Sequence, residues 1–221
     1  MSHFINLHTH RKPQLEDEIV IRNAFTQNKA SVCELPYFLS AGIHPWWIER
    51  STFSNLNNLQ ELMYCPNVIA LGECGIDRAK GPEIPVQLKV LEEQLELSKA
   101  FSKPVIMHVV KAYSDLPPLM KKYQFTGIIH GFKGNHYEAE MLIDHGFKLS
   151  FGYRLRLESN LTHVFKSLKA DSVYLETDIK PLIISDMYEL AAGLRGMSIE
   201  ELKEQINRNF ERDFSLVLPN E

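Results

Sequence analysis

The stretch FINLHTHR, from Phe4 to Arg11, ends a short apolar run with two histidines that stand two residues apart. Such a run is typical of a buried strand, in which successive side chains alternate between the two faces. His8 and His10 would then point the same way, with about 6.7 Å between them at about 3.3 Å of rise per residue. The stretch is compatible with a metal site or with a polar loop that carries two ordinary histidines, and taken alone it favours the loop.

Seven further apolar runs of strand length follow along the chain. They span 18–25, 37–44, 68–75, 104–109, 126–132, 147–153 and 173–178. From the third run of the whole series onward, helical periodicity follows each strand, over 55–64, 86–101, 116–123, 137–145, 160–169, 187–194 and 199–214. Ser198, with Glu201 three residues later, predicts a capping box for the last helix.

This alternation of strands and helices predicts a parallel α/β fold, and eight repeats predict a TIM-type (β/α)8 barrel. The N-terminal units look abbreviated, because only nine residues, Thr9 to Asp17, separate the first two strands. A parallel crossover normally takes a dozen or more residues. We therefore expect no first helix, and a second strand that is antiparallel or lies at the barrel's edge. No linker or repeat divides the chain, so we expect a single domain over 1–221.

The composition describes an ordinary globular protein. The chain has 221 residues, 44% of them hydrophobic, and a formal net charge of −4, which does not favour bulk binding of nucleic acid. No apolar run approaches the roughly 20 residues that span a bilayer, and no secretory signal is evident. Three cysteines without metal-site spacing are expected to be reduced thiols. We expect a cytoplasmic protein with no membrane association and no obligate protein partner.

The informative residues stand at the ends of the predicted strands. Six of them end five different strands: His8, His10, Glu73, His108, His130 and Asp178. In a barrel the C-terminal ends of the strands form the face that carries active sites. Each residue alone has a structural explanation, but six convergent imidazoles and carboxylates would be costly to bury without a cation. The set suits one or two divalent metals, with Glu73 central enough to bridge a pair. Four nitrogen ligands favour Zn, Mn, Fe or Ni over an all-oxygen Mg or Ca site.

A series of motifs resembles a known family. HTH, SAGIHPW, ALGECGID, KPVIMH, IIHGFKG, YLETD and NFERDF follow in order the motifs of the TatD-related metal-dependent hydrolases, from Phe4 to about Phe214. The resemblance implies a TIM-type barrel, a two-metal site, and hydrolysis of phosphodiester bonds, often from the 3′ end of DNA. It implies that one metal is bound by His8, His10, Glu73 and Asp178, and the other by Glu73, His108 and His130. The expected cofactors are two divalent ions, with Zn, Mn, Mg and Ni as candidates.

The chain departs from the family pattern at several positions. Asn6 stands where the family usually has Asp, and Val110 stands where it usually has Arg. Pro181 comes one residue late after the ETD motif, and the usual stretch beyond it is missing. The loops that shape the substrate groove are therefore expected to differ.

Several residues just beyond the predicted ligands are candidates for substrate binding. The candidates are Lys111, Lys133, Arg154, Arg78 and Trp46. The cations would hold phosphate oxygens, and Trp46 would stack on a nucleobase. Alternatively, these cations are the ordinary charges of loops, and the pair Trp46 and Trp47 is a hydrophobic lid. His44 belongs to the family motif, and we expect it near the metals rather than bound to them.

The leading functional hypothesis is a deoxyribonuclease that cleaves phosphodiester bonds by a metal-activated hydroxide. Asp178 is the expected proton acceptor, and Glu73 is expected to act with it through the metals. The second hypothesis is hydrolysis of a small phosphoester, lactone or amide on the same barrel. The third is a metal-binding protein without catalysis. The expected partner is DNA or another phosphoester substrate.

Overall fold

The computed structural model describes residues 2–25, 29–48 and 52–218 of the chain. Within these ranges eight strands follow one another in sequence order, and each neighbouring pair whose register is described runs parallel. The strands are β1 (Phe4–Thr9), β2 (Glu18–Phe25), β3 (Phe38–Gly42), β4 (Val68–Asp77), β5 (Val105–Val110), β6 (Gly127–Ile129), β7 (Lys148–Phe151) and β8 (Val173–Leu175). All eight predicted strands are confirmed, although β3, β6, β7 and β8 are shorter than the apolar runs that predicted them.

Helices follow every strand from β3 onward. The α-helices of the described residues are α1 (Thr52–Leu62), α2 (Ile84–Phe101), α3 (Leu116–Tyr123), α4 (His136–Asp144), α5 (Ser159–Ser167), α6 (Ile184–Arg195) and α7 (Ile199–Phe214). Short 3₁₀ helices are η1 (Lys29–Glu34), η2 (Pro45–Trp47), η3 (Tyr113–Asp115), η4 (Tyr153–Arg156) and η5 (Ala170–Ser172). The capping box at the start of α7 is confirmed, because Glu201 N–H donates to Ser198 Oγ and Ser198 N–H donates to Glu201 Oε2. Parallel strands in sequence order with intervening helices are the topology of a TIM-type (β/α)8 barrel, as predicted.

The connection between β1 and β2 confirms one expectation and corrects another. Residues 10–17 form only turns and irregular chain, so the first helix is missing as predicted. The expectation of an antiparallel or edge strand is wrong, because Ile5 pairs with Ile19 in parallel register and β2 lies between β1 and β3 in the strand order. To start a parallel β2, the chain must return from the end of β1 to the level of its start, a distance of about 20 Å for a six-residue strand. The eight residues 10–17, when extended, reach about 26 Å. A loop can therefore replace the helical crossover.

The chain divides into two compact units, 1–22 with 130–221, and 23–129. The first unit holds β1, the start of β2, β7, β8 and the helices α4 to α7. The second unit holds the end of β2, β3 to β6 and the helices α1 to α3. The single domain expected over 1–221 stays a prediction.

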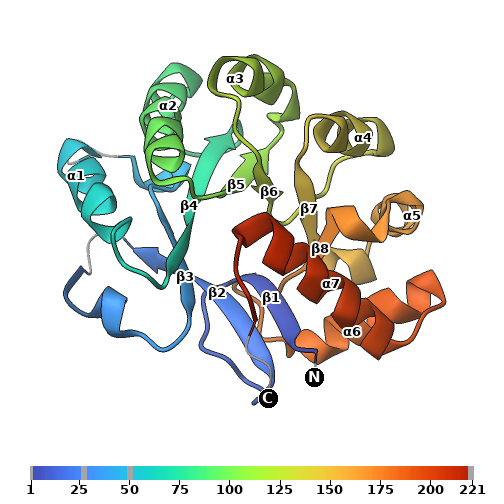
Figure 1. Ribbon diagram of the computed structural model, residues 1–221. Helices are drawn as coiled ribbons and strands as arrows, with labels where there is room; N and C mark the ends of the chain where they lie inside the picture. The colour runs from blue at the N-terminus through green and yellow to red at the C-terminus, as the bar shows by residue number, and fades with distance from the viewer. Residues whose placement is uncertain (1, 26–28, 49–51, 219–221) are drawn as a thin grey trace. The chain divides into compact units, whose positions relative to one another are not determined.

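In the first unit, α6 and α7 lie beside β1 (Figure 1). The hydroxyl of Tyr188 on α6 accepts a hydrogen bond from Ile5 N–H and donates one to Ile5 C=O, at 3.0 and 3.1 Å. On α7, the Asn207 side chain bonds both the N–H and the C=O of His3, at 2.9 and 2.7 Å. The two helices therefore fix the strand that leads to His8 and His10.

Replacing Tyr188 with Phe is expected to lower the free energy of unfolding by about 1–3 kcal/mol, because it leaves a buried backbone N–H of Ile5 without this acceptor. Chemical denaturation measures the loss. The control is Tyr64→Phe, since Tyr64 is 73% exposed. Equal stability of the two variants would contradict the role assigned to the Tyr188 hydroxyl.

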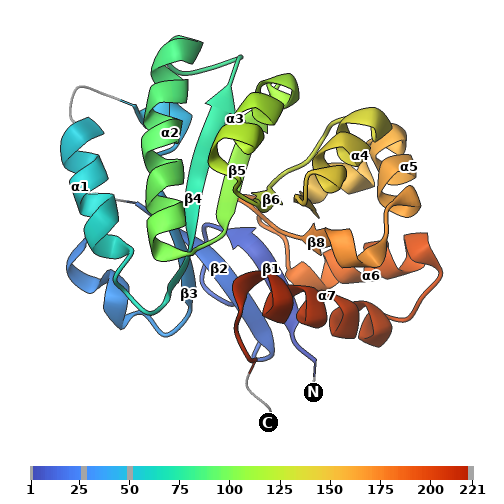
Figure 2. The same ribbon diagram turned by 45° about the horizontal axis from the view of Figure 1, so that its top comes forward.

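In the second unit, α2 runs alongside β4 and next to α1 (Figure 2). Two buried glutamines of α2 fasten it to the ends of strands. Gln87 accepts a bond from Asp77 N–H at 2.8 Å and donates to Asp77 C=O at 2.9 Å. Gln94 makes the same pair of bonds with Ile43, at 2.7 and 3.2 Å. These bonds hold the C-terminal ends of β3 and β4, from which His44 and Asp77 project.

The cysteines correct a further expectation. Cys33 and Cys65 form a disulfide, with 5.0 Å between their Cα atoms, so the expectation of reduced thiols is wrong for this pair. The fold joins them because η1 packs against α1 and because Asn67, after α1, donates a hydrogen bond to Val32 C=O of η1. Their separation of 32 residues does not signal this contact. Cys74 is a buried free thiol whose pKa is raised by burial and then by the charge of Glu73, as in an unreactive packing residue.

In the described ranges, none of the helices combines the length and the apolar character needed to cross a bilayer.

Candidate metal centre

The ends of β1 and β8 bring the first group of donors together. His8 is in β1 and His10 directly follows its last residue, Thr9. Both histidines approach Asp178, with 3.8 and 3.7 Å from their Nε2 atoms to Asp178 Oδ1. One ligand atom of each of the three residues lies within 4.8 Å of those of the other two. The backbone secures this geometry, because Asp178 N–H donates to His8 C=O and His10 N–H donates to Asp178 C=O. Asp178 keeps a left-handed φ of 51° there.

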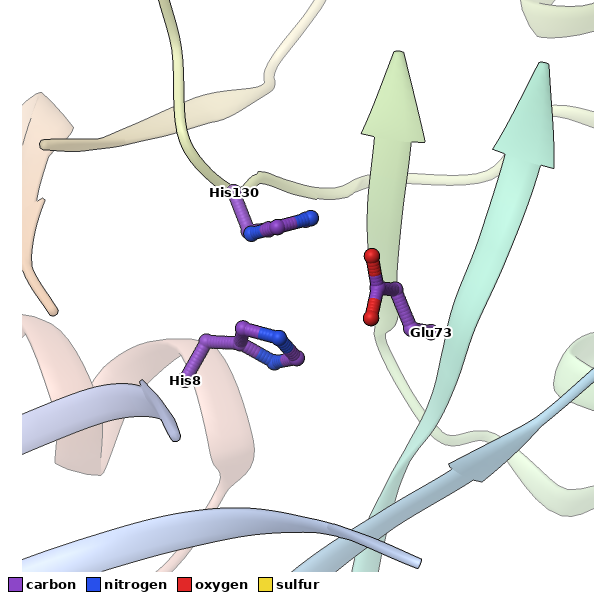
Figure 3. A group of neighbouring side chains, drawn as sticks. All are labelled: His8, Glu73 and His130. Carbon is purple, nitrogen blue, oxygen red and sulfur yellow. The ribbon is translucent and has the colours of Figure 1, made fainter. Parts of the chain in front are cut away.

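His130 and Glu176 stand beside these residues. The rings of His8 and His130 lie 4.2 Å apart between centroids, and Figure 3 shows the two rings next to each other. Glu176, two residues before Asp178, places Oε1 3.4 Å from His130 Nδ1. We call His8, His10, His130, Glu176 and Asp178 the first cluster; all five belong to the first unit.

The carboxylate of Glu176 is almost completely buried, with 1% of the residue exposed. Burial raises its pKa, but the charge and hydrogen bond of His130, followed by His8 and Ser150, outweigh burial and hold that pKa below its usual value. A buried, ionised carboxylate beside an imidazole is suited to orient that imidazole when the ring binds a metal.

In the second unit, a second group of donors surrounds Glu73 of β4, which is also drawn in Figure 3. Glu73 Oε1 lies 3.2 Å from His44 Nε2 and 3.0 Å from His108 Nδ1. Ligand atoms of these three residues lie within 4.8 Å of one another. Asn23 of β2 accepts the backbone N–H of Glu73 at 3.2 Å, which fixes the strand at this point.

Asp77 completes this second cluster, which we define as His44, Glu73, Asp77 and His108. Its Oδ2 atom lies 3.0 Å from His108 Nε2 and accepts a bond of 2.6 Å from the indole N–H of Trp46. Burial raises the pKa of Asp77, but the hydrogen bonds from Trp46, His108 and the Ala79 N–H hold it below the usual value. His108 thus faces a carboxylate at each ring nitrogen, so a metal bound at one nitrogen would leave the other carboxylate to orient the ring.

Two glycines let β4 approach β5 closely enough for these contacts. Gly75 has φ +145°, and a Cβ atom there would lie 2.0 Å from His108 C=O. Gly72 has φ +147°, and a Cβ there would lie 2.3 Å from Ile106 C=O. The small residues on either side of Glu73 are therefore required by the backbone that carries the second cluster.

Replacing Gly75 with Ala is expected to lower the free energy of unfolding by at least about 3 kcal/mol, because the strained φ and the overlap with His108 C=O add together. Thermal and chemical unfolding measure the effect. The matched control is Gly193→Ala in α6, where a Cβ meets nothing within 4 Å. That control is expected to be neutral or stabilising by up to about 1 kcal/mol; similar losses in both variants would contradict the explanation.

The five residues predicted to bind substrate have different surroundings. Trp46 lies at the second cluster, with its ring centroid 4.9 Å from that of His44 and Lys80 Nζ 3.6 Å from its ring. Arg78 forms a two-pronged ion pair with Asp115, and Arg154 pairs with Glu158. Both guanidinium groups therefore already have a carboxylate. Lys111 and Lys133 are exposed just beyond β5 and β6. The binding roles of all five stay predictions.

Sequence reasoning missed two carboxylates. Glu176 and Asp77 stand two and four residues from Asp178 and Glu73, at the even spacing that puts strand side chains on one face. The same even spacing predicted that His8 and His10 share a face, and it could have predicted Glu176 and Asp77 as well. His44 is a member of the second cluster, and whether it binds a metal stays a prediction.

The donors of both clusters suit a divalent metal. Imidazole nitrogens with carboxylate oxygens are ligands of zinc, manganese, iron and nickel. Each cluster offers at least two imidazoles and one carboxylate. Together with the topology, this donor set defines a barrel hydrolase of the metal-dependent class.

Comparison with known proteins defines the family. The model of the family described as TatD related DNase matches residues 22–215. The uncharacterized metal-dependent hydrolase YjjV of Escherichia coli K12 is 30% identical over 173 residues, which cover 73% of this chain and 67% of that protein. The crystal structure of the same E. coli homologue matches with a TM-score of 0.82 and 26% identity, over 90% of this chain and 87% of that one. The chain belongs to the TatD family and is a metal-dependent hydrolase, as the motif series predicted.

Two other relatives bear on activity and fold. The 3′-5′ ssDNA/RNA exonuclease TatD of Erwinia billingiae is 27% identical over 201 residues, which cover 80% of this chain and 77% of that protein. A lactonase variant from Deinococcus radiodurans shares only the fold, with a TM-score of 0.65 and 14% identity over 96% of this chain and 94% of that one.

Proposed function

We propose that this chain is a deoxyribonuclease that hydrolyses phosphodiester bonds with the help of two divalent ions. The observation that supports it best is the convergence of His8, His10 and Asp178 at the ends of β1 and β8. Similarity to an exonuclease named for single-stranded DNA and RNA supports nucleic acid as the substrate.

The proposed ligands are the six residues predicted from the sequence. They are His8, His10, Glu73, His108, His130 and Asp178. Zn, Mn, Mg and Ni are the candidate ions, and imidazole donors in both clusters favour the transition metals. The proposal also keeps, as predictions, one domain over 1–221, a cytoplasmic location and no obligate protein partner.

Each residue of the first cluster has a distinct task in this proposal. Asp178 accepts the proton of the attacking water; its side chain is 36% exposed, so water reaches it, whereas His8 is fully buried. His8 and His10 would bind a divalent ion together with Asp178, and Glu176 orients His130. Divalent ions, when bound, lower the pKa of water towards neutrality and offset charge on the phosphate. Lys111 and Lys133 would contact the non-bridging oxygens as point charges.

The test is a time course on end-labelled single-stranded DNA. The protein is stripped of metal and then supplied with Mg, Mn or Zn in turn. Stepwise shortening that requires a metal supports the proposal and gives the direction of digestion. Intact DNA in the presence of bound metal would contradict a nuclease, and failure to bind any metal would contradict the whole proposal.

A second candidate is hydrolysis of a small uncharged ester or lactone by the same donors. It is favoured by the ion pairs that Arg78 and Arg154 already form with carboxylates, and by the exposed apolar side chain of Ile179, which directly follows Asp178. A panel of generic esters, lactones and phosphodiesters separates the two candidates. Turnover of the neutral substrates alone would replace the nuclease proposal.

A further inference from the structure

A buried network of hydrogen bonds links β1, the start of β2 and the residue before Asp178. Asn6 on β1 is 2% exposed and lies on the same strand face as His8. Its Nδ2 atom donates to Glu18 Oε1 and to Thr177 Oγ1, both at 2.9 Å, and its Oδ1 atom accepts Thr177 N–H at 3.1 Å. Thr177 Oγ1 in turn donates to Thr9 Oγ1 at 3.1 Å.

Glu18 decides which way the Asn6 amide faces. The second oxygen of its carboxylate accepts the backbone N–H of Gln14 at 2.6 Å and of Leu15 at 3.3 Å. An ionised carboxylate only accepts hydrogen bonds, so the neighbouring atom of Asn6 must be the NH₂ group. The Asn6 oxygen therefore faces Thr177, and an aspartate at residue 6 would bring two carboxylates into contact.

The consequence reaches the first cluster through the backbone. Thr177 directly precedes Asp178, whose φ of 51° is in the left-handed region that disfavours residues with a Cβ by about 1–2 kcal/mol. The bond from Thr177 N–H to Asn6 holds the chain just before this turn, and the bond from Asp178 N–H to His8 C=O holds the turn itself. Glu18 also ties down the loop of residues 10–17 that stands in place of a first helix.

We infer that Asn6 and Glu18 form a positioning pair that sets the backbone at Thr177 and Asp178, and through it the metal-ligand geometry of the first cluster. Neither side chain touches substrate in this inference. The backbone effect is independent of the proposed nuclease activity, whereas the effect on metal binding rests on the proposed metal centre.

The experiment compares Asn6→Asp, Glu18→Gln and the double variant with the wild type, and uses Asn160→Asp on the surface as a control. Amide hydrogen exchange at Thr177 and Asp178 in metal-free protein is the first readout. Asn6→Asp is expected to accelerate hydrogen exchange at both amides at least about tenfold. The double variant is expected to restore them, because the amide introduced at position 18 can donate to the carboxylate introduced at position 6.

Titration with Co²⁺, followed by its visible absorption, is the second readout. Loss of an outer-shell partner typically costs 10- to 100-fold in metal affinity, so about this loss is expected for Asn6→Asp, with rescue in the double variant.

Wild-type exchange rates in Asn6→Asp, or no rescue in the double variant, would overturn the inference. If Asn6→Asp does not fold, the double variant decides: wild-type exchange rates support the pair and faster rates overturn it. If the wild-type protein binds no Co²⁺, the proposed metal centre is contradicted. The exchange rates would still test the positioning pair of Asn6 and Glu18.

Discussion

Replacing Asp178 with Asn is expected to reduce turnover of single-stranded DNA at least about a thousandfold while the protein stays folded. The change removes the proton acceptor, a contribution of about 10²–10⁴ in rate, and weakens a metal ligand as well. Asn keeps the shape of the side chain and is among the residues that tolerate the left-handed region, so the φ of 51° costs no more than before. Release of label from the DNA end measures the rate, and circular dichroism measures the fold.

The matched control for this variant is Asp144→Asn at the end of α4, where the side chain is exposed and far from β8 in the sequence. It is expected to keep wild-type activity. Turnover in Asp178→Asn within tenfold of that control would remove Asp178 from the mechanism and leave proton transfer to another group.

The fold was predictable because its signals are local. Each strand shows an apolar run, each helix after β3 shows helical periodicity, and Ser198 with Glu201 marks the start of α7. The direction of β2 was not predictable, because it depends on the short length of β1 rather than on any residue pattern. The disulfide of Cys33 and Cys65 was not predictable either, because the packing of η1 against α1 and the bond from Asn67 to Val32 C=O bring the two residues together.

The candidate site was predictable as far as alternation along single strands reaches. His8 and His10 follow from the period of two, and the same period applied to β4 and to the end of β8 predicts Asp77 and Glu176. Contacts between different strand ends have no such signal. The bond from Trp46 to Asp77 and the ion pair of Arg78 with Asp115 arise from loops whose course the sequence pattern does not define.

The departure at residue 6 shows how one substitution is understood only with its neighbour. The motif resemblance predicts an aspartate at residue 6, and Asn6 taken alone looks like the loss of a charge. In the structure Glu18 supplies a carboxylate 2.9 Å from the Asn6 amide, so the charge lies on β2 instead of β1. An acceptor-only neighbour makes the amide the appropriate residue at this position.

Replacing Glu73 with Gln is expected to lower the metal affinity of the stripped protein at least about a hundredfold and to lower turnover by a similar factor. Glu73 is the carboxylate that both His44 and His108 face, at 3.2 and 3.0 Å, so its neutral isostere removes one of the two anionic donors of the second cluster and leaves Asp77. A bound metal ion supplies several kcal/mol of charge stabilisation in the transition state, and each 1.4 kcal/mol corresponds to tenfold, so turnover falls when the ion is lost. Metal content after equilibrium dialysis against Zn or Mn measures the affinity.

Glu92→Gln is the control for this second variant, because Glu92 pairs only with Lys122 among the contacts described and lies on the surface of α2. It is expected to retain both metal and activity. The Glu73 variant should fold, since the backbone bond from Glu73 N–H to Asn23 does not involve its side chain. Full metal content with lost turnover would make Glu73 a residue of the chemical step alone, whereas full content with full turnover would exclude the second cluster from the site.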